Sequence, residues 1–408
     1  MEKLASALSI LLMGFCGVQL FVRFIRMLRG QEKERLHGQA TGSELALAAL
    51  CALASRVLIY LLAYVMYRIA STGSQPFLKM LEPLWVHWDA RHYLGIAKNG
   101  YTAVGDDRLR LVFFPLYSAV MRLVSPLFGG NLFAAGTAVS LLCASGAAAL
   151  LYDLAYGLFG KKTARLALAY FLLNPMSVFL GCVYTESLFI FLTLAAVRLL
   201  RRGKPWLAAL CGMLSALTRM PGAIVSGLFI IALLAKIPKK KFSARAVMAC
   251  LGQVLIVFCG LFIYWGINYV VTGDPMMYLT YQRENWFQQA GSFWQSTSNT
   301  MNYFLHAVGE EDWLFTWSFQ LAAMFYVYAL LAFGQKKLPF DLAAYSFVYV
   351  AAVLAPTWLL SGARYLYGLC VLPLLQARVH RHHGAVLALS AALLGVFTFG
   401  YTVLGLVF

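Results

Sequence analysis

Charged side chains are scarce in this sequence of 408 residues, at 12% of the chain, whereas 61% of the residues are hydrophobic. A soluble globular protein carries about 25% charged residues. A soluble fold is therefore excluded, because burying this much apolar side chain would leave the exterior without its normal charge. Lipid has to be the solvent for much of the chain, and we predict a polytopic membrane protein.

Acidic residues are scarcer still, with 16 Asp and Glu against 33 Lys and Arg, for a net charge of +17. Such an excess suggests a nucleic-acid ligand only if it lies on one soluble face. Here the basic residues form short clusters between apolar runs, which is how a membrane protein marks its cytoplasmic loops. The sequence also lacks a C-x-x-C motif, and its eight cysteines all fall within apolar stretches, so we expect small, unpaired core hydrophobes.

Apolar runs occupy most of the chain. They lie at about residues 4–22, 45–70, 131–159, 163–183, 185–200, 205–218, 221–235, 246–271, 313–333, 340–360, 365–377 and 384–408. A spanning helix needs ~20 residues, so the runs at 205–218, 221–235 and 365–377 are tilted ends or re-entrant half-helices. We predict a single all-α membrane domain over residues 1–408, with about 10–12 transmembrane helices.

The basic clusters predict the orientation. Laid on alternate sides of the apolar runs, all of them fall on one side, which is then cytoplasmic: Arg23–Arg35, Lys161–Arg165, Arg198–Lys204, Lys236–Arg245, Lys336–Lys337 and Arg378–Arg381. Both termini and the loops 71–130 and 272–312 then face the outside or a lumen. The apolar stretch 111–128 would reverse every later cluster if it spanned, so we predict that it lies in the interface or re-enters.

One amphipathic helix is predicted on the outer leaflet over residues 82–101, with Pro83 suited to its start and Asn99-Gly100 to its end. At helical spacing, one face of it carries Trp85, Trp88, Asp89, His92 and Ile96, while Arg91 points elsewhere. An acid and an imidazole would thus share a face with two tryptophans. The alternative is an interfacial anchor in which Asp89 pairs with Arg91 or caps a turn.

Two further outside features carry polar residues beside apolar helices. Pro175, in Asn174-Pro175, is predicted to break or kink a helix near the outer surface, and Glu186 falls in the first turn of the next helix. A capping motif of Thr185 and Glu186 explains the second feature equally well. The outer loop 272–312 is rich in aromatic residues, which suits an interfacial belt or a sugar platform.

The predicted topology places two arginines on the outer side of the membrane. Arg219 lies between two short apolar runs, and Arg364 is placed similarly. An arginine at membrane depth costs roughly 2.5–3.5 kcal/mol on the insertion scale. Each side chain therefore either snorkels to the surface or binds an anion such as a lipid phosphate.

These strings together resemble the PIG-V family, the second mannosyltransferase of GPI-anchor synthesis with its bacterial relatives, within the GT-C class of membrane glycosyltransferases. The resemblance covers roughly residues 85–190. It rests on Trp88-Asp89-Ala90-Arg91-His92-Tyr93 with Ile96-Ala97 and Gly100-Tyr101, on Phe113-Phe114-Pro115-Leu116-Tyr117, on Asn174-Pro175 through Phe179, and on Tyr184-Thr185-Glu186-Ser187-Leu188-Phe189, with Thr218-Arg219 as a weaker match.

The resemblance implies a GT-C fold and a donor of mannose on a polyprenyl or dolichyl phosphate. An acid in the first large outside loop is the catalytic base of such enzymes, and that position matches Asp89. The sequence departs from the pattern in having a lone carboxylate where many GT-C enzymes have an acidic pair. It also departs at Met176 and at Met220-Pro221, so the donor sugar and the acceptor stay open.

The expected reaction is a single displacement. Asp89 takes the proton of an acceptor hydroxyl, which attacks the sugar from the face opposite the phosphate and inverts the anomeric centre. Arg219 or Arg364 stabilises the departing phosphate, His92 orients Asp89 or binds the phosphate, and Glu186 binds hydroxyls. The full set of expected substrate-binding residues is His92, Arg91, Trp88, Tyr93, Glu186, Tyr184, Asn174, Arg219 and Arg364. We predict no metal, although Asp89 with His92 leaves a divalent ion open.

Two other functions remain as alternatives. A lipid or sugar flippase needs an inverted repeat or a polar midplane pathway, and the sequence has no repeat and few midplane charges beyond Arg56 and Asp153. A non-catalytic scaffold of glycan synthesis would share the hydropathy without needing Asp89.

We expect a multi-pass protein of a bacterial cell membrane with its active site facing out, because eukaryotic family members tend to be longer. The endoplasmic reticulum membrane with a lumenal site is the alternative. The sequence identifies neither the acceptor nor the oligomeric state.

Overall fold

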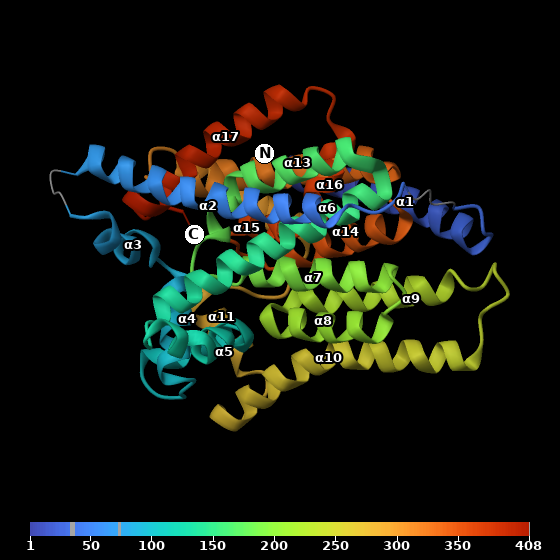
Figure 1. Cartoon of the computed structure of the whole chain (residues 1–408), viewed down its shortest axis with the longest axis horizontal. Helices are drawn as coiled ribbons and strands as arrows, with labels where there is room; N and C mark the ends of the chain where they lie inside the picture. The colour runs from blue at the N-terminus through green and yellow to red at the C-terminus, as the bar shows by residue number, and fades with distance from the viewer. Residues whose placement is uncertain (33–36, 72–74, 408) are drawn as a thin grey trace.

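The structure, a computed structural model, describes residues 1–32, 37–71 and 75–407. Over these ranges the regular structure is entirely helical, which confirms the predicted all-α fold (Figure 1). Parts of the predicted basic cluster 23–35, of the outer loop 71–130 and of the last apolar run lie outside the described residues.

Six elements among the described residues are long and apolar enough to cross a membrane. They are α1 (Glu2–Leu28), α2 (Gly42–Ala70), α6 (Leu132–Leu173), α10 (Ala244–Thr272), the element Trp313–Lys337 that contains α13 (Phe319–Gly334), and the element His383–Leu404 that contains α17 (His383–Phe399). The protein is therefore a multi-pass membrane protein.

Shorter helices pack among these six. They are α7 (Glu186–Arg201), α8 (Pro205–Thr218), the 3-10 helix η4 (Met220–Val225) with α9 (Ser226–Leu234), α14 (Phe340–Val353), α15 (Gly362–Tyr367) and α16 (Leu372–Val379). In Figure 1, α7 and α8 lie side by side between α6 and α10. The count of 10–12 spans predicted from the sequence included these helices, several of which are shorter than the ~20 residues of a straight span.

The helix α6 contains the break predicted between the runs 131–159 and 163–183. At Gly160 the backbone leaves the helical region, with φ 80° and ψ 177°. This conformation is essentially restricted to glycine, because a Cβ atom would collide with the backbone. The predicted break at Pro175 is also confirmed, since α6 ends at Leu173 and Pro175 begins the 3-10 helix η3 (Pro175–Leu180).

The outer segment 82–101 is two helices, so the prediction of one amphipathic helix is wrong. α3 (Phe77–Trp85) ends two residues after Pro83, which has no N–H to donate within a helix, and α4 (Asp89–Asn99) begins after a turn. At this turn Trp88 has a positive φ of 46°. The five residues expected on one face are separated as a result, with Trp85 and Ile96 buried and Trp88 44% exposed.

The stretch 111–128, which we predict to lie in the interface or to re-enter, is not a straight helix, and its bend fits either a re-entrant loop or a broken span. The 3-10 helix η1 (Asp106–Val112) and the segment Pro115–Phe128, which contains α5 (Pro115–Val124) and the 3-10 helix η2 (Ser125–Phe128), are bent by 105° relative to each other. In Figure 1, α3, α4 and α5 gather at one end of the bundle with α11 (Met277–Trp286), and the connection from α9 to α10 lies at the other end. α12 (Phe293–His306) packs beside α1.

The two charges that the sequence placed at the midplane, Arg56 and Asp153, hold helices together, and the second lies near the C-terminal end of α7 rather than at the midplane. Buried Arg56 on α2 donates to the carbonyl oxygens of Leu172 and Ser177, at the end of α6 and within η3. Asp153 on α6 pairs with Arg198 at 2.6 Å and with Arg202 at 2.7 Å, joining α6 to the end of α7. Both charges serve packing between helices rather than a polar path through the membrane.

The eight cysteines are all free, as predicted. Four of them are buried, but Cys51 on α2 is exposed, so the prediction of core burial is wrong for this residue. Cys51 lies on the outer surface of a helix long and apolar enough to cross the membrane, where lipid takes the place of a protein core.

Candidate active site

Four charged side chains from distant segments meet at the end of the bundle that holds α3, α4 and α5. Arg364 Nη2 donates to Asp89 Oδ2 at 2.6 Å, and Arg364 Nε lies 3.3 Å from Glu186 Oε1. Arg219 Nη1 donates to the same Glu186 oxygen. We call Asp89, Glu186, Arg219 and Arg364 the charge cluster.

The backbone explains the place of each member. Asp89 is the first residue of α4 and Glu186 the first residue of α7, where the positive end of the helix dipole favours a carboxylate. Arg219 follows the last residue of α8, and Arg364 lies in the short helix α15. The lone carboxylate noted in the sequence is thus joined by a second acid, 97 positions later in the chain.

Burial differs across the charge cluster. The side chains of Glu186 and Arg364 are 1% and 5% exposed, that of Arg219 is 16% exposed, and that of Asp89 is 25% exposed. Glu186 Oε2 and Arg364 Nη1 are buried without a hydrogen-bond partner in the part of the chain that the structure describes. Unsatisfied buried polar atoms are costly and are typical of functional sites. Asp89 is the member that a substrate can reach most easily.

Aromatic rings surround the two arginines. The Arg364 guanidinium carbon lies 5.2 Å from the ring centre of Phe179 and 5.1 Å from that of Tyr184. The Arg219 guanidinium carbon lies 5.0 Å from the ring centre of Tyr365. Cation–π contacts of this kind hold a desolvated arginine in place, and the low local dielectric strengthens its attraction for an anion.

The structure does not contain the Asp89–Arg91 pair, the capping motif at Thr185 or the snorkelling arginines that the sequence offered as alternatives. Asp89 pairs with Arg364 rather than with its neighbour Arg91, which is exposed. The Thr185 side chain makes no capping hydrogen bond, so Thr185 and Glu186 are not a capping motif. Both arginines face carboxylates instead of snorkelling alone to the surface.

The other predicted site residues have mixed positions. Tyr184 donates through its hydroxyl to the His87 carbonyl at 3.1 Å, and the Tyr93 hydroxyl lies 3.5 Å from Thr185 Oγ1, so both rings border the charge cluster. Asn174 accepts from the Met176 N–H at 2.9 Å and caps η3. Trp88 donates to the Gly405 carbonyl at 3.0 Å, which ties the start of α4 to the C-terminal segment.

His92 follows Asp89 by three positions and packs against aromatic rings. Its ring stacks on Phe113 with centres 4.5 Å apart and meets Trp286 edge-on at 6.4 Å. Burial lowers the pKa of His92 from its ordinary value of 6.5, and the opposing effect of Asp89 is smaller. His92 is therefore neutral at neutral pH, which favours an orienting role over charge-based binding of a phosphate.

Two residues at the site, Tyr365 and Trp286, were not among the predicted site residues. Tyr365 follows Arg364 in the chain and lies over Arg219, and Trp286 of the second outer loop lies near His92. The aromatic richness of the loop 272–312 was the only sequence signal for Trp286. In the described ranges no three His, Cys, Asp or Glu side chains gather closely enough to hold a metal ion.

The chain is similar to known mannosyltransferases. A family model described as mannosyltransferase (PIG-V) matches residues 69–328, a longer range than the resemblance found by motif. Mouse GPI alpha-1,6-mannosyltransferase 2 is 33% identical over 173 residues, which are 39% of this chain and 34% of the mouse protein. The human protein of the same name is 31% identical over 151 residues, 35% of this chain and 30% of the relative. The chain thus spans about a third of the length of these relatives.

Among solved structures, the archaeal oligosaccharyltransferase AglB from Archaeoglobus fulgidus, in complex with an inhibitory peptide and a dolichol-phosphate, is similar with a TM-score of 0.41 and 13% identity. The likeness covers 86% of this chain and 56% of that chain.

Asp89, Glu186 and Arg219 lie inside the range of the family model, and Arg364 lies outside it. From the family match, which covers well over half of its residues, the chain belongs to the mannosyltransferase (PIG-V) family.

Proposed function

We propose that this protein transfers mannose from a polyprenyl-phosphate donor to a glycolipid or another membrane-associated acceptor. The reaction takes place at the end of the bundle opposite the basic loops. The observation that carries the proposal is the ion pair between Asp89 and Arg364, with Glu186 and Arg219 in the same cluster. The activity of the mammalian relatives supports mannose as the sugar.

Asp89 acts as the general base in this scheme. The acceptor hydroxyl gives its proton to the Asp89 carboxylate while its oxygen forms a bond to the anomeric carbon. The bond from that carbon to the phosphate oxygen breaks, and its electron pair leaves with the phosphate. Attack from the face opposite the phosphate inverts the anomeric centre.

The arginines balance the charge of this step. The polyprenyl phosphate gains negative charge as it departs, and fixed guanidinium groups in a dry site stabilise that charge without reorganisation. The arriving phosphate competes with Asp89 for Arg364, so donor binding frees the carboxylate for the acceptor hydroxyl. Glu186 keeps both arginines in place during this exchange, a role that replaces the expected binding of hydroxyls.

The test uses purified full-length protein in proteoliposomes with radiolabelled polyprenyl-phosphate mannose and a lipid extract from the source. We expect labelled glycolipid with the unchanged protein and a loss of transfer of at least ~10²-fold with Asp89→Asn. The matched control is Asp341→Asn, because Asp341 pairs with Arg201 at 2.7 Å and its side chain is 28% exposed, close to the value for Asp89. Equal transfer by Asp89→Asn and the unchanged protein would overturn the proposal.

The same experiment separates the alternatives. A scaffold or a flippase would form no labelled glycolipid with the unchanged protein. A flippase is disfavoured because Arg56 and Asp153 are engaged in contacts between helices. The bacterial cell membrane stays a prediction from the sequence.

A further inference from the structure

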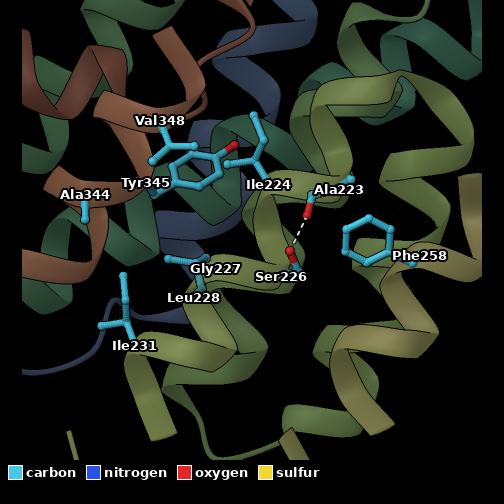
Figure 2. Close-up of a pocket in the computed structure, with 10 residues that line it drawn as sticks. All are labelled: Ala223, Ile224, Ser226, Gly227, Leu228, Ile231, Phe258, Ala344, Tyr345 and Val348. Atoms are coloured by element: carbon cyan, nitrogen blue, oxygen red, sulfur yellow. Dashed lines mark hydrogen bonds between the residues drawn. The ribbon is translucent and has the colours of Figure 1, made fainter. Parts of the chain in front are cut away.

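An apolar cavity of about 320 Å³ lies between four elements of the bundle (Figure 2). η4 and α9 contribute Ala223, Gly227 and Ile231, α10 contributes Phe258, and α14 contributes Ala344 and Val348. Two hydroxyls belong to its lining. That of Ser226 donates to the Ala223 carbonyl at 2.6 Å, as the dashed line in Figure 2 marks, and that of Tyr345 on α14 is buried. The cavity therefore presents almost only hydrocarbon, and its volume falls within the range of ligand pockets.

The position of the cavity links it to the charge cluster. The lining residue Ala223 follows Arg219 by four positions, which at ~2.0 Å per residue separates the two backbone positions by about 8 Å along the axis of η4. Phe258 lies midway along α10, so the cavity is at the depth of the hydrocarbon. Val348, which lines it, is 50% exposed, so the cavity reaches the outer surface of the bundle.

Gly227 contributes open space to this cavity. A Cβ atom added at Gly227 would meet no heavy atom within 4 Å. At the nearby Gly222 it would come within 2.3 Å of the backbone of Ser215 and Ala216, so that glycine is needed for close packing of η4 on α8. A larger side chain at Gly227 can thus fill the cavity without displacing the protein.

We propose that this cavity holds the isoprenoid chain of the donor, next to the phosphate, an inference that rests on the proposed function. Arg219 does not line the cavity, but it precedes the lining residue Ala223 by only four positions, so a lipid with its first isoprene units in the apolar cavity can reach this arginine with its phosphate. A single cavity of this size accommodates one chain, as a polyprenyl phosphate carries, whereas a membrane phospholipid carries two. One molecule thus matches both the nearby cation and the single apolar cavity.

The first test measures binding without catalysis. A polyprenyl phosphate that carries no sugar and has a diazirine in its first isoprene units is photolysed with the full-length protein in proteoliposomes, and the labelled peptides are identified by mass spectrometry. We expect label on residues 223–231 and 344–348. Label confined to other helices would overturn the proposal, and so would equal labelling of this cavity by a diazirine phospholipid at the same mole fraction.

The second test fills the cavity. Gly227→Leu should abolish the photolabel and raise the KM for polyprenyl-phosphate mannose about tenfold or more, because displaced methylene groups lose their burial. The matched control is Gly266→Leu on α10, where an added Cβ also meets nothing within 4 Å and the residue lies away from the cavity. An unchanged KM and label in Gly227→Leu would overturn the assignment.

The two tests distinguish this proposal from the proposed function. Photolabelling of the cavity without any mannose transfer would leave the cavity assignment standing and remove the mannosyltransferase proposal. Mannose transfer that is insensitive to Gly227→Leu, with label elsewhere, would leave the enzyme and remove the cavity.

Discussion

The reactive chemistry of the site depends on a few side chains whose charges balance. Asp89 and Glu186 contribute two negative charges, and Arg219 and Arg364 contribute two positive ones. Removing one partner of a buried ion pair costs about 3–5 kcal/mol, because the remaining charge is left without compensation. Glu186 is the most sensitive member, since one of its oxygens contacts both arginines.

Glu186→Gln is expected to lower both stability and activity. The free energy of unfolding should fall by about 3–5 kcal/mol, and the transfer rate of the folded protein should fall about 10²-fold as the arginines lose their alignment. Thermal unfolding in detergent and transfer assays with normalised folded protein measure the two effects.

The matched control is Asp153→Asn, because Asp153 also bridges two arginines but does so at the C-terminal end of α7, away from the charge cluster. This variant should lose stability, by less because Arg202 is 47% exposed, and should keep its transfer rate. Normal transfer by folded Glu186→Gln would contradict the positioning role of Glu186.

His92 gives the site a pH dependence of stability. Its pKa is lowered by burial below the ordinary 6.5, so the unfolded chain binds a proton at a higher pH than the folded protein does. Asp107 and Arg110 also act on this imidazole, with smaller effects than burial. The stability that neutral His92 contributes is present above pH 6.5 and is lost as the pH falls through its lowered pKa.

His92→Phe keeps the stack on Phe113 and removes the titration. The midpoint of thermal unfolding should therefore decrease less between pH 7.5 and pH 5.5, on either side of the ordinary His pKa of ~6.5, in this variant than in the unchanged protein. Some decrease will remain, because burial also lowers the pKa of His87. Exposed His382 provides the control, and His382→Phe should behave like the unchanged protein. Equal slopes for all three proteins would refute the effect.

At the scale of elements, breaks between helices place the site. α4 begins at Asp89 only because α3 stops at Trp85, and α7 begins at Glu186 after η3 interrupts the chain. Each break points a helix N-terminus, with its partial positive charge, at the end of the bundle that holds the charge cluster. A continuous helix over 82–101 would have left Asp89 in a helix interior.

Gly160→Ala tests the break within α6. We expect a loss of about 1–3 kcal/mol in the free energy of unfolding, because φ 80° with ψ 177° is strained for any residue with a Cβ. Gly157→Ala is the control, since its Cβ would lie 3.5 Å from the Gly38 carbonyl oxygen, an ordinary contact. The control should be neutral or up to ~1 kcal/mol more stable. Urea or thermal unfolding that finds Gly160→Ala as stable as its control would show that the strain is absent.

At the scale of the whole molecule, ion pairs tie both ends of the bundle. The charge cluster joins α4, α7 and α15 at one end, whereas Asp153 and Asp341 bind arginines near the end of α7 at the other. The clusters of lysine and arginine that predict the cytoplasmic side belong to this second end. The proposed chemistry is thereby kept on the opposite side of the membrane.

Cysteine labelling tests this sidedness. Asp106, the first residue of η1, and Lys239, in the connection between α9 and α10, are both exposed, and each is replaced by cysteine in a separate variant. In sealed right-side-out vesicles, a membrane-impermeant maleimide should label Asp106→Cys above the level of the unchanged protein. Lys239→Cys should react only after permeabilisation. The reverse pattern would put the charge cluster on the cytoplasmic side.

The sequence alone determined the membrane class, the all-helical fold, the family, and Asp89, Glu186, Arg219 and Arg364 as candidates. Hydropathy, basic clusters and short motifs are local properties, so they can be read without a fold. Prediction from the sequence failed where one local pattern fits two structures. At residues 82–101 the amphipathic spacing fits one helix or two, and it does not reveal the turn at Trp88.

Only the tertiary structure decided which candidates touch. The pair of Asp89 and Arg364 spans 275 positions, and the apolar cavity is bounded by helices from three parts of the chain. Such contacts follow from how helices pack against one another, and each pairing depends on the rotation and depth of both partners. No spacing within a single segment encodes them.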